Sequence, residues 1–258
     1  MDLGLANKVA LVTGGSKGIG HACAHLFLSE GARVGICSRA QANIDKALSG
    51  LPGAHGYAAD LTSDTQALDV VDRIENDIGP IDILVNSAGA ATRTPASELT
   101  PAAWRAAMDA KYFSYINVLD PVIKRMAARG SGTIVNIIGN GGKIASPVHL
   151  AGGAANAALM LASVGLANAY ASQGVRVVGL NPGLTETDRV AEGLKASAKL
   201  AGSTEEEALA DALKRIPIGR MASPDDIANV VAFLSSSKAS YVTGVVISMD
   251  GAQVPTIV

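Results

Sequence analysis

A glycine-rich turn near the start of the chain has the residue types and the spacing that bind a phosphate group. Residues 13–20 read TGGSKGIG and stand between a short apolar run, 9–12, and a helical pattern, 19–30. A turn from a strand into a helix aims backbone N–H groups and the positive end of the helix dipole at an anion. Its glycines let the backbone approach a pyrophosphate closely. The candidate contacts in the turn are Gly14, Ser16, Lys17, Gly18, Ile19 and Gly20.

Ser38 and Arg39 follow the second expected strand, 33–37, where the adenosine ribose meets a doubly wound sheet. An acidic residue at this point would bind both ribose hydroxyls and favour NAD. Ser38 and Arg39 stand there instead, and Lys17 adds a second cation from the glycine turn. Because an arginine fork pairs with a phosphate and a lysine adds a point charge, we predict a 2′-phosphate here, and therefore NADP. The alternative is a pair of ordinary solvated surface cations.

Three further motifs decide between a dinucleotide site and an ordinary glycine-rich turn. Asp60-Leu61 follows the third expected strand, NSAG at 86–89 follows the fourth, and NPGLTET at 181–187 follows the sixth. With the turn at 13–20, they resemble the short-chain dehydrogenase/reductase family, whose motifs read TGxxxGIG, NNAG and PGxxxT. The resemblance covers essentially residues 8–251. It implies a nicotinamide dinucleotide cofactor and a small-molecule substrate that is oxidised or reduced.

The resemblance also implies a role for each of these later motifs. In the family, a pair such as Asp60 and Leu61 flanks the adenine. Asn86 would brace the central sheet, while Ala88 and Gly89 let the cofactor lie against bare backbone. The remaining implied cofactor residues are Pro182 and Gly183, which turn the chain, and Thr185 or Thr187, which helps to hold the nicotinamide carboxamide.

The family's proton-handling residues, an Asn, Ser, Tyr and Lys set, are replaced in this chain. The tyrosine is the acid/base in a Tyr-x-x-x-Lys motif, and the lysine and cofactor lower its pKa from about 10. None of the five tyrosines here has a lysine four residues later. Aligning 156–159 with the family's Lys-Ala-Ala-Leu puts Asn156 at the lysine position and Gly152 at the tyrosine position. The serine position falls on Gly139 and the asparagine position on Lys111.

Lys111, His149 and Asn156 are therefore the candidate catalytic residues. Lys111 could supply the cation that is lost at Asn156. His149 lies one helical turn before Gly152, and an imidazole needs little tuning to exchange protons near neutral pH. The alternatives are a His149 that only caps or packs against the helix, and a Lys111 that is structural, although a buried ammonium then needs a partner.

Three functions are compatible with a complete cofactor cradle and a missing catalytic set. The first is an NADP(H)-dependent oxidoreductase that acts on a carbonyl or hydroxyl of a small, apolar molecule with relocated chemistry. The second is a non-enzymatic NADP-binding protein, which acts as a sensor or a partner subunit. The third is a lyase or isomerase that uses the same pocket without net redox chemistry.

Alternation of strands and helices predicts a single-domain α/β fold of the doubly wound, Rossmann type. We expect a parallel sheet of seven strands with helices on both faces, and a polar, helix-prone substrate lid at about 188–215. The expected strands are 8–13, 33–37, 55–59, 81–85, 133–138, 174–180 and 245–249. The expected helices are 18–30, 62–77, 101–129, 149–172 and one that starts near 223.

The composition of the chain limits which partners it can bind and in which compartment it is expected. The chain has 258 residues, 48% of them hydrophobic, and a net charge of −2, so it can bury a core and carries no electrostatic footprint for nucleic acid. A strand that starts by residue 8 leaves no room for a signal peptide, and two cysteines that look buried suit a reducing cytoplasm. We expect no metal.

Residues 144–175 contain no charged side chain and are long enough to cross a membrane. They also contain Pro147, several glycines and several amides, so we favour a loop and a helix buried in protein, and expect no membrane contact. The helix also suits the interface of a homodimer or homotetramer, which is the quaternary form that the resemblance implies. Its alternative is burial within one chain.

Overall fold

The computed structural model describes residues 2–89 and 91–255, and within them the chain forms one parallel sheet. Its seven strands follow the order β3-β2-β1-β4-β5-β6-β7, so the direction of strand addition reverses between β1 and β4. This arrangement confirms the predicted doubly wound fold, and the predicted strand limits agree within two residues. The strands are β1 Val9–Thr13, β2 Arg33–Ser38, β3 His55–Ala58, β4 Ile83–Asn86, β5 Gly132–Ile137, β6 Val175–Pro182 and β7 Val246–Met249.

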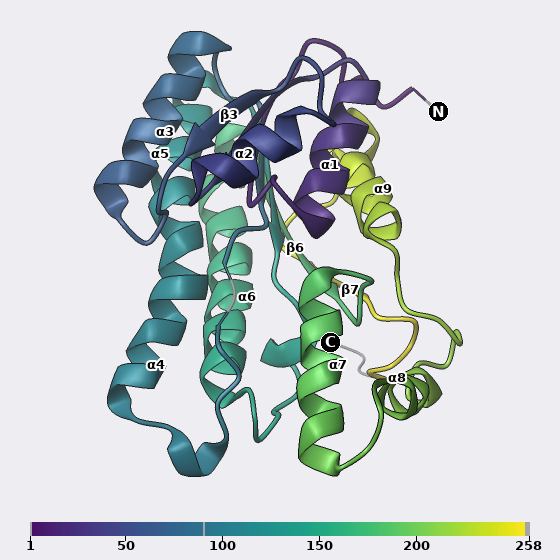
Figure 1. The fold of residues 1–258 in the computed structure, drawn as a ribbon. Helices are drawn as coiled ribbons and strands as arrows, with labels where there is room; N and C mark the ends of the chain where they lie inside the picture. Colours follow the sequence, from purple (N-terminus) through teal and green to yellow (C-terminus); the bar gives the residue numbers. More distant parts are fainter. Residues whose placement is uncertain (1, 90, 256–258) are drawn as a thin grey trace.

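Helices cover both faces of the sheet, as Figure 1 shows. One face packs against α1, α2 and α9, and the other against α3, α5 and α6. The helices α7 and α8 lie to one side of this sandwich, in the lower part of the view. The helices are α1 Gly18–Ser29, α2 Gln41–Leu48, α3 Asp64–Asp77, α4 Pro101–Ala107, α5 Ser114–Arg129, α6 Leu150–Tyr170, α7 Asp188–Ala201, α8 Glu205–Lys214 and α9 Pro224–Ser235.

Alternate residues of β1 contribute to two different cores. Ala10 and Val12 belong to the core beneath α1 and α9, whereas Val9 and Leu11 belong to the core beneath α3 and α5. A strand that is buried on both faces must be apolar at every position, which explains the unbroken apolar run before the glycine turn. The first polar residue is Thr13, at the carboxyl end of the strand.

The segment between Thr100 and Gly130 differs from its prediction as one continuous helix. It begins as expected, because Thr100 Oγ1 accepts a hydrogen bond from the Ala103 N–H at 3.2 Å and Pro101 stands in the first turn. Its middle, Met108–Phe113, is π-helical and separates α4 from α5. A π turn is wider than an α turn and turns the following side chains to a new direction, which is why such turns recur at functional sites.

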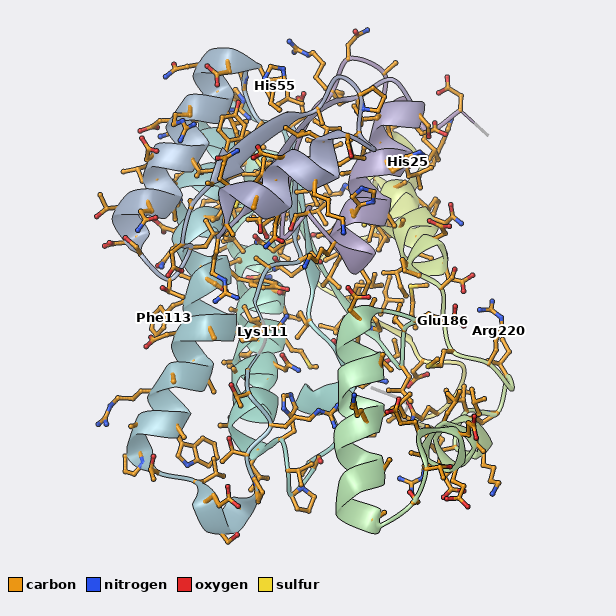
Figure 2. All side chains as sticks on the ribbon, viewed as in Figure 1. His25, His55, Lys111, Phe113, Glu186 and Arg220 are labelled. Carbon is orange, nitrogen blue, oxygen red and sulfur yellow. The ribbon has the colours of Figure 1, made fainter. Side chains whose placement is uncertain are left out.

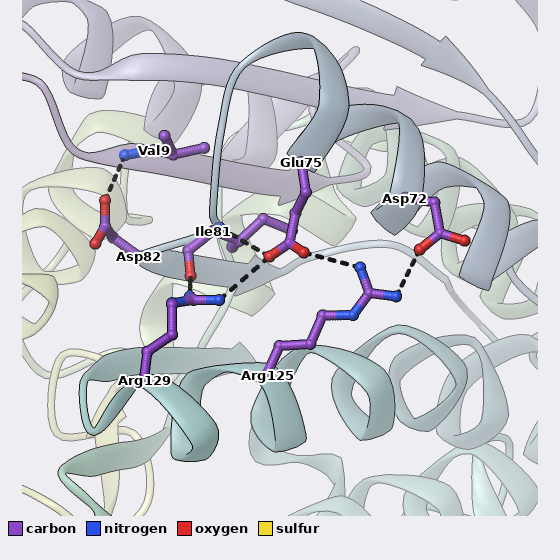
Figure 3. Close-up of polar contacts among 7 residues, drawn as sticks. All are labelled: Val9, Asp72, Glu75, Ile81, Asp82, Arg125 and Arg129. Atoms are coloured by element: carbon purple, nitrogen blue, oxygen red, sulfur yellow. Dashed lines mark hydrogen bonds and ion pairs between the residues drawn. The ribbon is translucent and has the colours of Figure 1, made fainter.

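An ion-pair network fixes α5 against α3 and against the segment that leads into β4, as Figure 3 shows. Arg125 contacts Asp72 and Glu75, and Arg129 contacts Glu75 at 3.4 Å. Arg129 also donates a hydrogen bond to the Ile81 carbonyl at 2.6 Å. Single exposed ion pairs are worth little, but arginines that share carboxylates across two helices fix their orientation. The network therefore holds α5, and the π turn before it, in place.

Within the described residues, one stretch, Leu150–Gln173, is long and apolar enough to cross a membrane by length and composition. Its helix, α6, packs on the sheet through residues such as Ala155, Leu159 and Ala167. Its outer face is apolar, and the Leu161 side chain is 76% exposed. The alternative of a helix buried wholly within one chain therefore fits only one side of α6.

Candidate active site

Two adjoining cavities open near the carboxyl ends of β1 and β4, where the strand order reverses. One surrounds the glycine turn and has a volume of about 680 Å³; it is named the glycine-turn cavity. The other has a volume of about 810 Å³ and is named the Lys111 cavity. Gly89 lines both, so the two cavities meet just after β4. A crevice at such a reversal point is the usual ligand site of an open α/β sheet.

Most of the predicted cofactor residues line the glycine-turn cavity. They come from the turn after β1, from the ends of β2 and β3, from the loop after β4 and from the start of α7. They are Gly14, Ser16, Lys17, Gly18, Ile19, Ser38, Arg39, Asp60, Leu61, Ala88, Gly89 and Thr187.

The floor of the glycine-turn cavity is bare backbone. Gly14 has φ +66°, and a Cβ atom there would lie 2.9 Å from both the Cα and the N of Ala88. The Thr13 hydroxyl accepts hydrogen bonds from the N–H groups of Ser87 and Ala88 at 3.0 and 3.2 Å, which fixes the loop after β4 beside the turn. A pyrophosphate can therefore approach main-chain N–H groups at the start of α1, so the residues present fit a dinucleotide.

Two cations stand at the mouth of this cavity. Lys17 and Arg39 are exposed and line it together with Asp60. Hydrogen bonds from Thr62 and the nearby Arg39 charge lower the pKa of the Asp60 carboxyl. The Ser38 hydroxyl also accepts a hydrogen bond from the Ser16 hydroxyl at 3.0 Å. Cations and hydroxyls at this position fit a ribose phosphate.

Five predicted cofactor residues are not part of the described lining of the glycine-turn cavity. Asn86 is fully buried and donates a hydrogen bond to Asn136 Oδ1 at 3.0 Å, which is the bracing role expected of it. Gly20 packs against the Gly14 carbonyl, where no Cβ atom would fit. The Thr185 hydroxyl donates to the Gly183 carbonyl at 3.3 Å. The five residues are Gly20, Asn86, Pro182, Gly183 and Thr185. Because Thr187 lines the cavity and Thr185 does not, Thr187 is the better placed of the two threonines to contact a cofactor.

The three candidate catalytic residues line the same wall of the Lys111 cavity. Lys111 comes from the π turn, His149 from the residue that caps α6, and Asn156 from the second turn of α6. The opposite wall comes from α7 and α8, in the segment predicted to be a lid. The described lining there includes Val190, Gly193, Leu194, Ala201, Ser203, Ala208, Asp211, Ala212 and Arg215.

Lys111 is held by a tyrosine that the sequence analysis did not select. Its Nζ donates hydrogen bonds to Tyr115 Oη at 2.7 Å and to the Ile137 carbonyl at 3.1 Å. The Tyr115 hydroxyl donates to the same carbonyl. Lys111 is 7% exposed and Tyr115 is fully buried. Figure 2 shows Lys111 inside the molecule and Phe113, two residues later, at its outer edge.

A tyrosine and a lysine are thus paired in this chain, but in the order Lys111-x-x-x-Tyr115. Side chains four residues apart along a helix meet in either order, so a search in both directions would have found the pair. Tyr115 packs against Ile138 and Leu159 and lies outside the described lining of both cavities. It can therefore orient Lys111, but it does not face a ligand.

His149 fills the space that a side chain at Gly152 would need. A Cβ atom at Gly152 would lie 2.6 Å from His149 Nε2 and 2.9 Å from the Cβ of Ala91. Within the described residues, the buried His149 Nδ1 has no hydrogen-bond partner. Burial, reinforced by the charges of Arg93 and Lys111, lowers the pKa of the imidazole from its ordinary 6.5. The ring is therefore neutral near neutral pH, and its Nε2 edge lies where the family's tyrosine would start.

Asn156 is buried and faces the loop after β5. A Cβ atom at Gly141 would lie 3.2 Å from Asn156 Nδ2, and one at Gly139 would lie 3.6 Å from it. The same loop contacts the His149 ring, since a Cβ atom at Gly141 would also lie 3.2 Å from His149 Cδ2. The amide and the imidazole therefore share one corner of the Lys111 cavity.

Comparisons with known proteins agree with this architecture. Residues 14–252 match the family described as enoyl-(acyl carrier protein) reductase. The chain is 32% identical to the uncharacterized oxidoreductase YvrD of Bacillus subtilis, over 97% of this chain and 98% of that protein. It is 33% identical to the 3-oxoacyl-(acyl-carrier-protein) reductase FabG of Thermotoga maritima, over 96% and 98%.

A solved structure is also similar along its whole length. The L-sorbose reductase of Gluconobacter frateurii, complexed with NADPH and L-sorbose, has a TM-score of 0.92 and 29% identity, with 100% of both chains covered. The fold, the match over most of the chain and the identity to full-length relatives agree. The chain belongs to the short-chain dehydrogenase/reductase family of oxidoreductases.

Proposed function

We propose that this protein is an NADP(H)-dependent oxidoreductase that interconverts a hydroxyl and a carbonyl group of a small molecule, with His149 as the proton-exchanging residue. One observation carries the proposal: Lys111, His149 and Asn156 line one cavity, and this cavity joins the glycine-turn cavity at Gly89. A cofactor that lies along the glycine turn can therefore reach a substrate that lies beside these three side chains.

NADP rather than NAD is the cofactor that Lys17 and Arg39 favour. Both are cations at the mouth of the glycine-turn cavity, where they would hold a 2′-phosphate. The sorbose reductase structure, whose cofactor is NADPH, is compatible with this choice. When bound, the cofactor supplies or accepts a hydride at its nicotinamide ring.

The side chains of the Lys111 cavity would handle the proton and the substrate oxygen. In the oxidising direction, the neutral His149 imidazole would accept the proton of the substrate hydroxyl. The carbon that bears this hydroxyl would give up a hydride to the nicotinamide ring, and its C–O bond would become a carbonyl. The Lys111 ammonium stabilises negative charge that develops on the oxygen, and the Asn156 amide orients the substrate. In the reducing direction the protonated imidazole returns its proton to the oxygen. The segment 188–215, which forms α7 and α8, is proposed as the lid over this cavity.

The second candidate function is a sensor or partner subunit that binds NADP without chemistry. It is favoured by the absence of Tyr-x-x-x-Lys and by the lack of any side chain at Gly139 and Gly152. A cofactor cradle that lacks a proton donor would bind NADP and transfer nothing.

Binding and turnover separate the two functions. NADPH binding is followed by fluorescence, and its oxidation is then measured with a panel of aldehydes, ketones and diketones. Turnover that His149→Gln abolishes, but His55→Gln does not, supports the oxidoreductase. His55 is a matched control because it lies at the far end of the molecule from Lys111, as Figure 2 shows. Tight binding without turnover on the whole panel supports the sensor, and no binding contradicts both.

We further propose that the protein is cytoplasmic and forms a homodimer or homotetramer through the outer face of α6. That face presents Leu161, Val164 and Gly165, an apolar and small-residue surface next to solvent. Light scattering tests the proposal: Leu161→Glu should shift the mass to a smaller assembly. An unchanged mass for Leu161→Glu would contradict this interface.

A further inference from the structure

We propose that the Lys111 cavity binds its substrate through a carboxylate, and that Arg93 is the residue that recognises it. The inference rests on the proposed function, because it names the class of carbonyl compound that the same cavity takes. That class is a small oxo acid and the corresponding hydroxy acid, in place of the apolar molecule that the sequence suggested.

A main-chain hydrogen bond sets Arg93 next to His149. The Thr94 N–H donates to the Val148 carbonyl at 3.1 Å, so the residue before Thr94 and the residue after Val148 lie in neighbouring segments. Arg93 and His149 both line the Lys111 cavity. The Arg93 charge is also felt at the imidazole, where it helps to lower the pKa of His149. A guanidinium and an imidazole therefore face one ligand volume.

The described lining of the Lys111 cavity has an excess of positive charge. Its cations are Arg93, Lys111 and Arg215, and its one carboxylate is Asp211. The Asp211 carboxylate is already paired with Lys214 on the same helix at 2.9 Å. A cavity with a surplus of one sign attracts ligands of the opposite sign. The expected ligand is therefore an anion.

Arg93 is the cation best suited to bind that anion beside His149, because the hydrogen bond between Thr94 and Val148 brings it next to the imidazole. Within the described part of the chain, no hydrogen bond or ion pair joins its guanidinium to another residue, and the side chain is exposed at the cavity. A guanidinium group binds a carboxylate through two parallel hydrogen bonds, and its single positive charge neutralises the single negative charge of the carboxylate. With its carboxylate on Arg93, a short oxo acid places its carbonyl oxygen beside the neighbouring His149.

Binding is tested first without turnover, on the full chain with and without saturating NADPH. The four histidines are observed by NMR, and the His149 signal is assigned from its loss in His149→Gln. Butyrate and its neutral analogue butanamide are then titrated. A carboxylate beside the imidazole favours its charged form, so butyrate should shift the His149 signal and raise the His149 pKa. Butanamide should do neither at the same concentrations.

Arg93→Gln should abolish the butyrate effect, whereas Arg105→Gln, an exposed arginine on α4 outside both cavities, should retain it. Arg93→Gln should also raise the His149 pKa of the ligand-free protein, because a repelling charge is removed. Equal responses to butyrate and butanamide, or a butyrate response that survives Arg93→Gln, would overturn the inference.

Turnover provides the second arm. With NADPH, the kcat/KM for 2-oxobutyrate should exceed that for its methyl ester. Arg93→Gln should lower the ratio of kcat/KM for the acid to kcat/KM for the ester about tenfold or more, because a charged hydrogen bond is lost only for the acid, whereas any change in the His149 pKa affects both compounds. Equal turnover of acid and ester would agree with the proposed oxidoreductase and would refute the recognition of a substrate carboxylate by Arg93. If neither compound is turned over, the NMR titration still decides the carboxylate question.

Discussion

Lys111 and Tyr115 form a buried pair, with Nζ of Lys111 2.7 Å from Oη of Tyr115 and both groups bonded to the Ile137 carbonyl. The family places a lysine beside a tyrosine that faces the ligand. Here the lysine lines the cavity and the phenol lies behind it. Under the proposed function, the phenol of Tyr115 would act on the substrate only through the position it gives to Lys111.

Tyr115→Phe should separate this positioning role from packing. The ring remains, but Lys111 loses an acceptor, and we expect kcat to fall about tenfold with unchanged NADPH binding, because a misdirected cation stabilises the reacting oxygen less well. The free energy of unfolding should fall by about 1–3 kcal/mol. The pH profile of kcat should change as well, which simple destabilisation would not cause. Tyr241→Phe is the control, since Tyr241 is fully exposed. Kinetics identical to that control would refute the role.

Oxidation of the alcohol substrate should need the neutral form of His149. The folded pKa is lowered below 6.5, so kcat/KM should rise with pH through that depressed pKa and stay level above it. Lys111→Met removes a charge that lowers this pKa and should move the rise to higher pH. Lys124→Met, on the exposed side of α5, should not. A single rise near the phenol pKa of about 10 would instead indicate a tyrosine base.

Gly152 and His149 should be energetically coupled. Gly152→Ala places a methyl group against the imidazole and should cost about 1–3 kcal/mol of stability, measured by denaturant unfolding. In a His149→Ala background the ring is gone and the close contact with the Ala91 Cβ remains, so the same change should cost less than in the unmodified chain. Gly165→Ala, on the same helix with no atom within 4 Å of its Cβ position in one chain, is the control, and its effect should be the same with and without His149→Ala. Additive effects at 149 and 152 would show that the ring lies elsewhere.

Arg39→Ala should weaken NADPH binding more than NADH binding. If Arg39 holds the 2′-phosphate, its loss should raise the NADPH Kd about tenfold or more and leave the NADH Kd nearly unchanged. Arg105→Ala provides a control at an exposed arginine outside the described cavity lining. Equal losses for the two cofactors would assign Arg39 to a part of the nucleotide that they share.

Much of the fold could be predicted because local signals mark it. The apolar run of β1, the glycine turn and the motifs at the strand ends each specify an element or a boundary. The helix α2 is absent from the predicted helices; it is only eight residues long and has two buried residues, Ile44 and Ala47. The π turn has no sequence signature, because the packing around it decides its shape.

Site residues could be predicted where they lie in or next to a sequence motif. They could not be predicted where only the folded chain brings them together. Lys111 and Asn156 follow from alignment with the family's motifs, and His149 follows from its place one helical turn before Gly152. Tyr115 was missed because the pair was sought in one order only. Arg93 could not be found, since its approach to His149 depends on a main-chain bond between segments far apart in the sequence.

Gly89 has φ +89°, and a Cβ atom there would collide with the Ala110 carbonyl and lie 2.8 Å from the Ser114 hydroxyl. This residue borders both cavities, and Ala110 immediately precedes Lys111. A bulkier residue at 89 would thus narrow the passage between the two cavities and displace the backbone that carries the Lys111 ammonium. Under the proposed function, cofactor affinity and reactivity toward the substrate could therefore not be adjusted separately at this position.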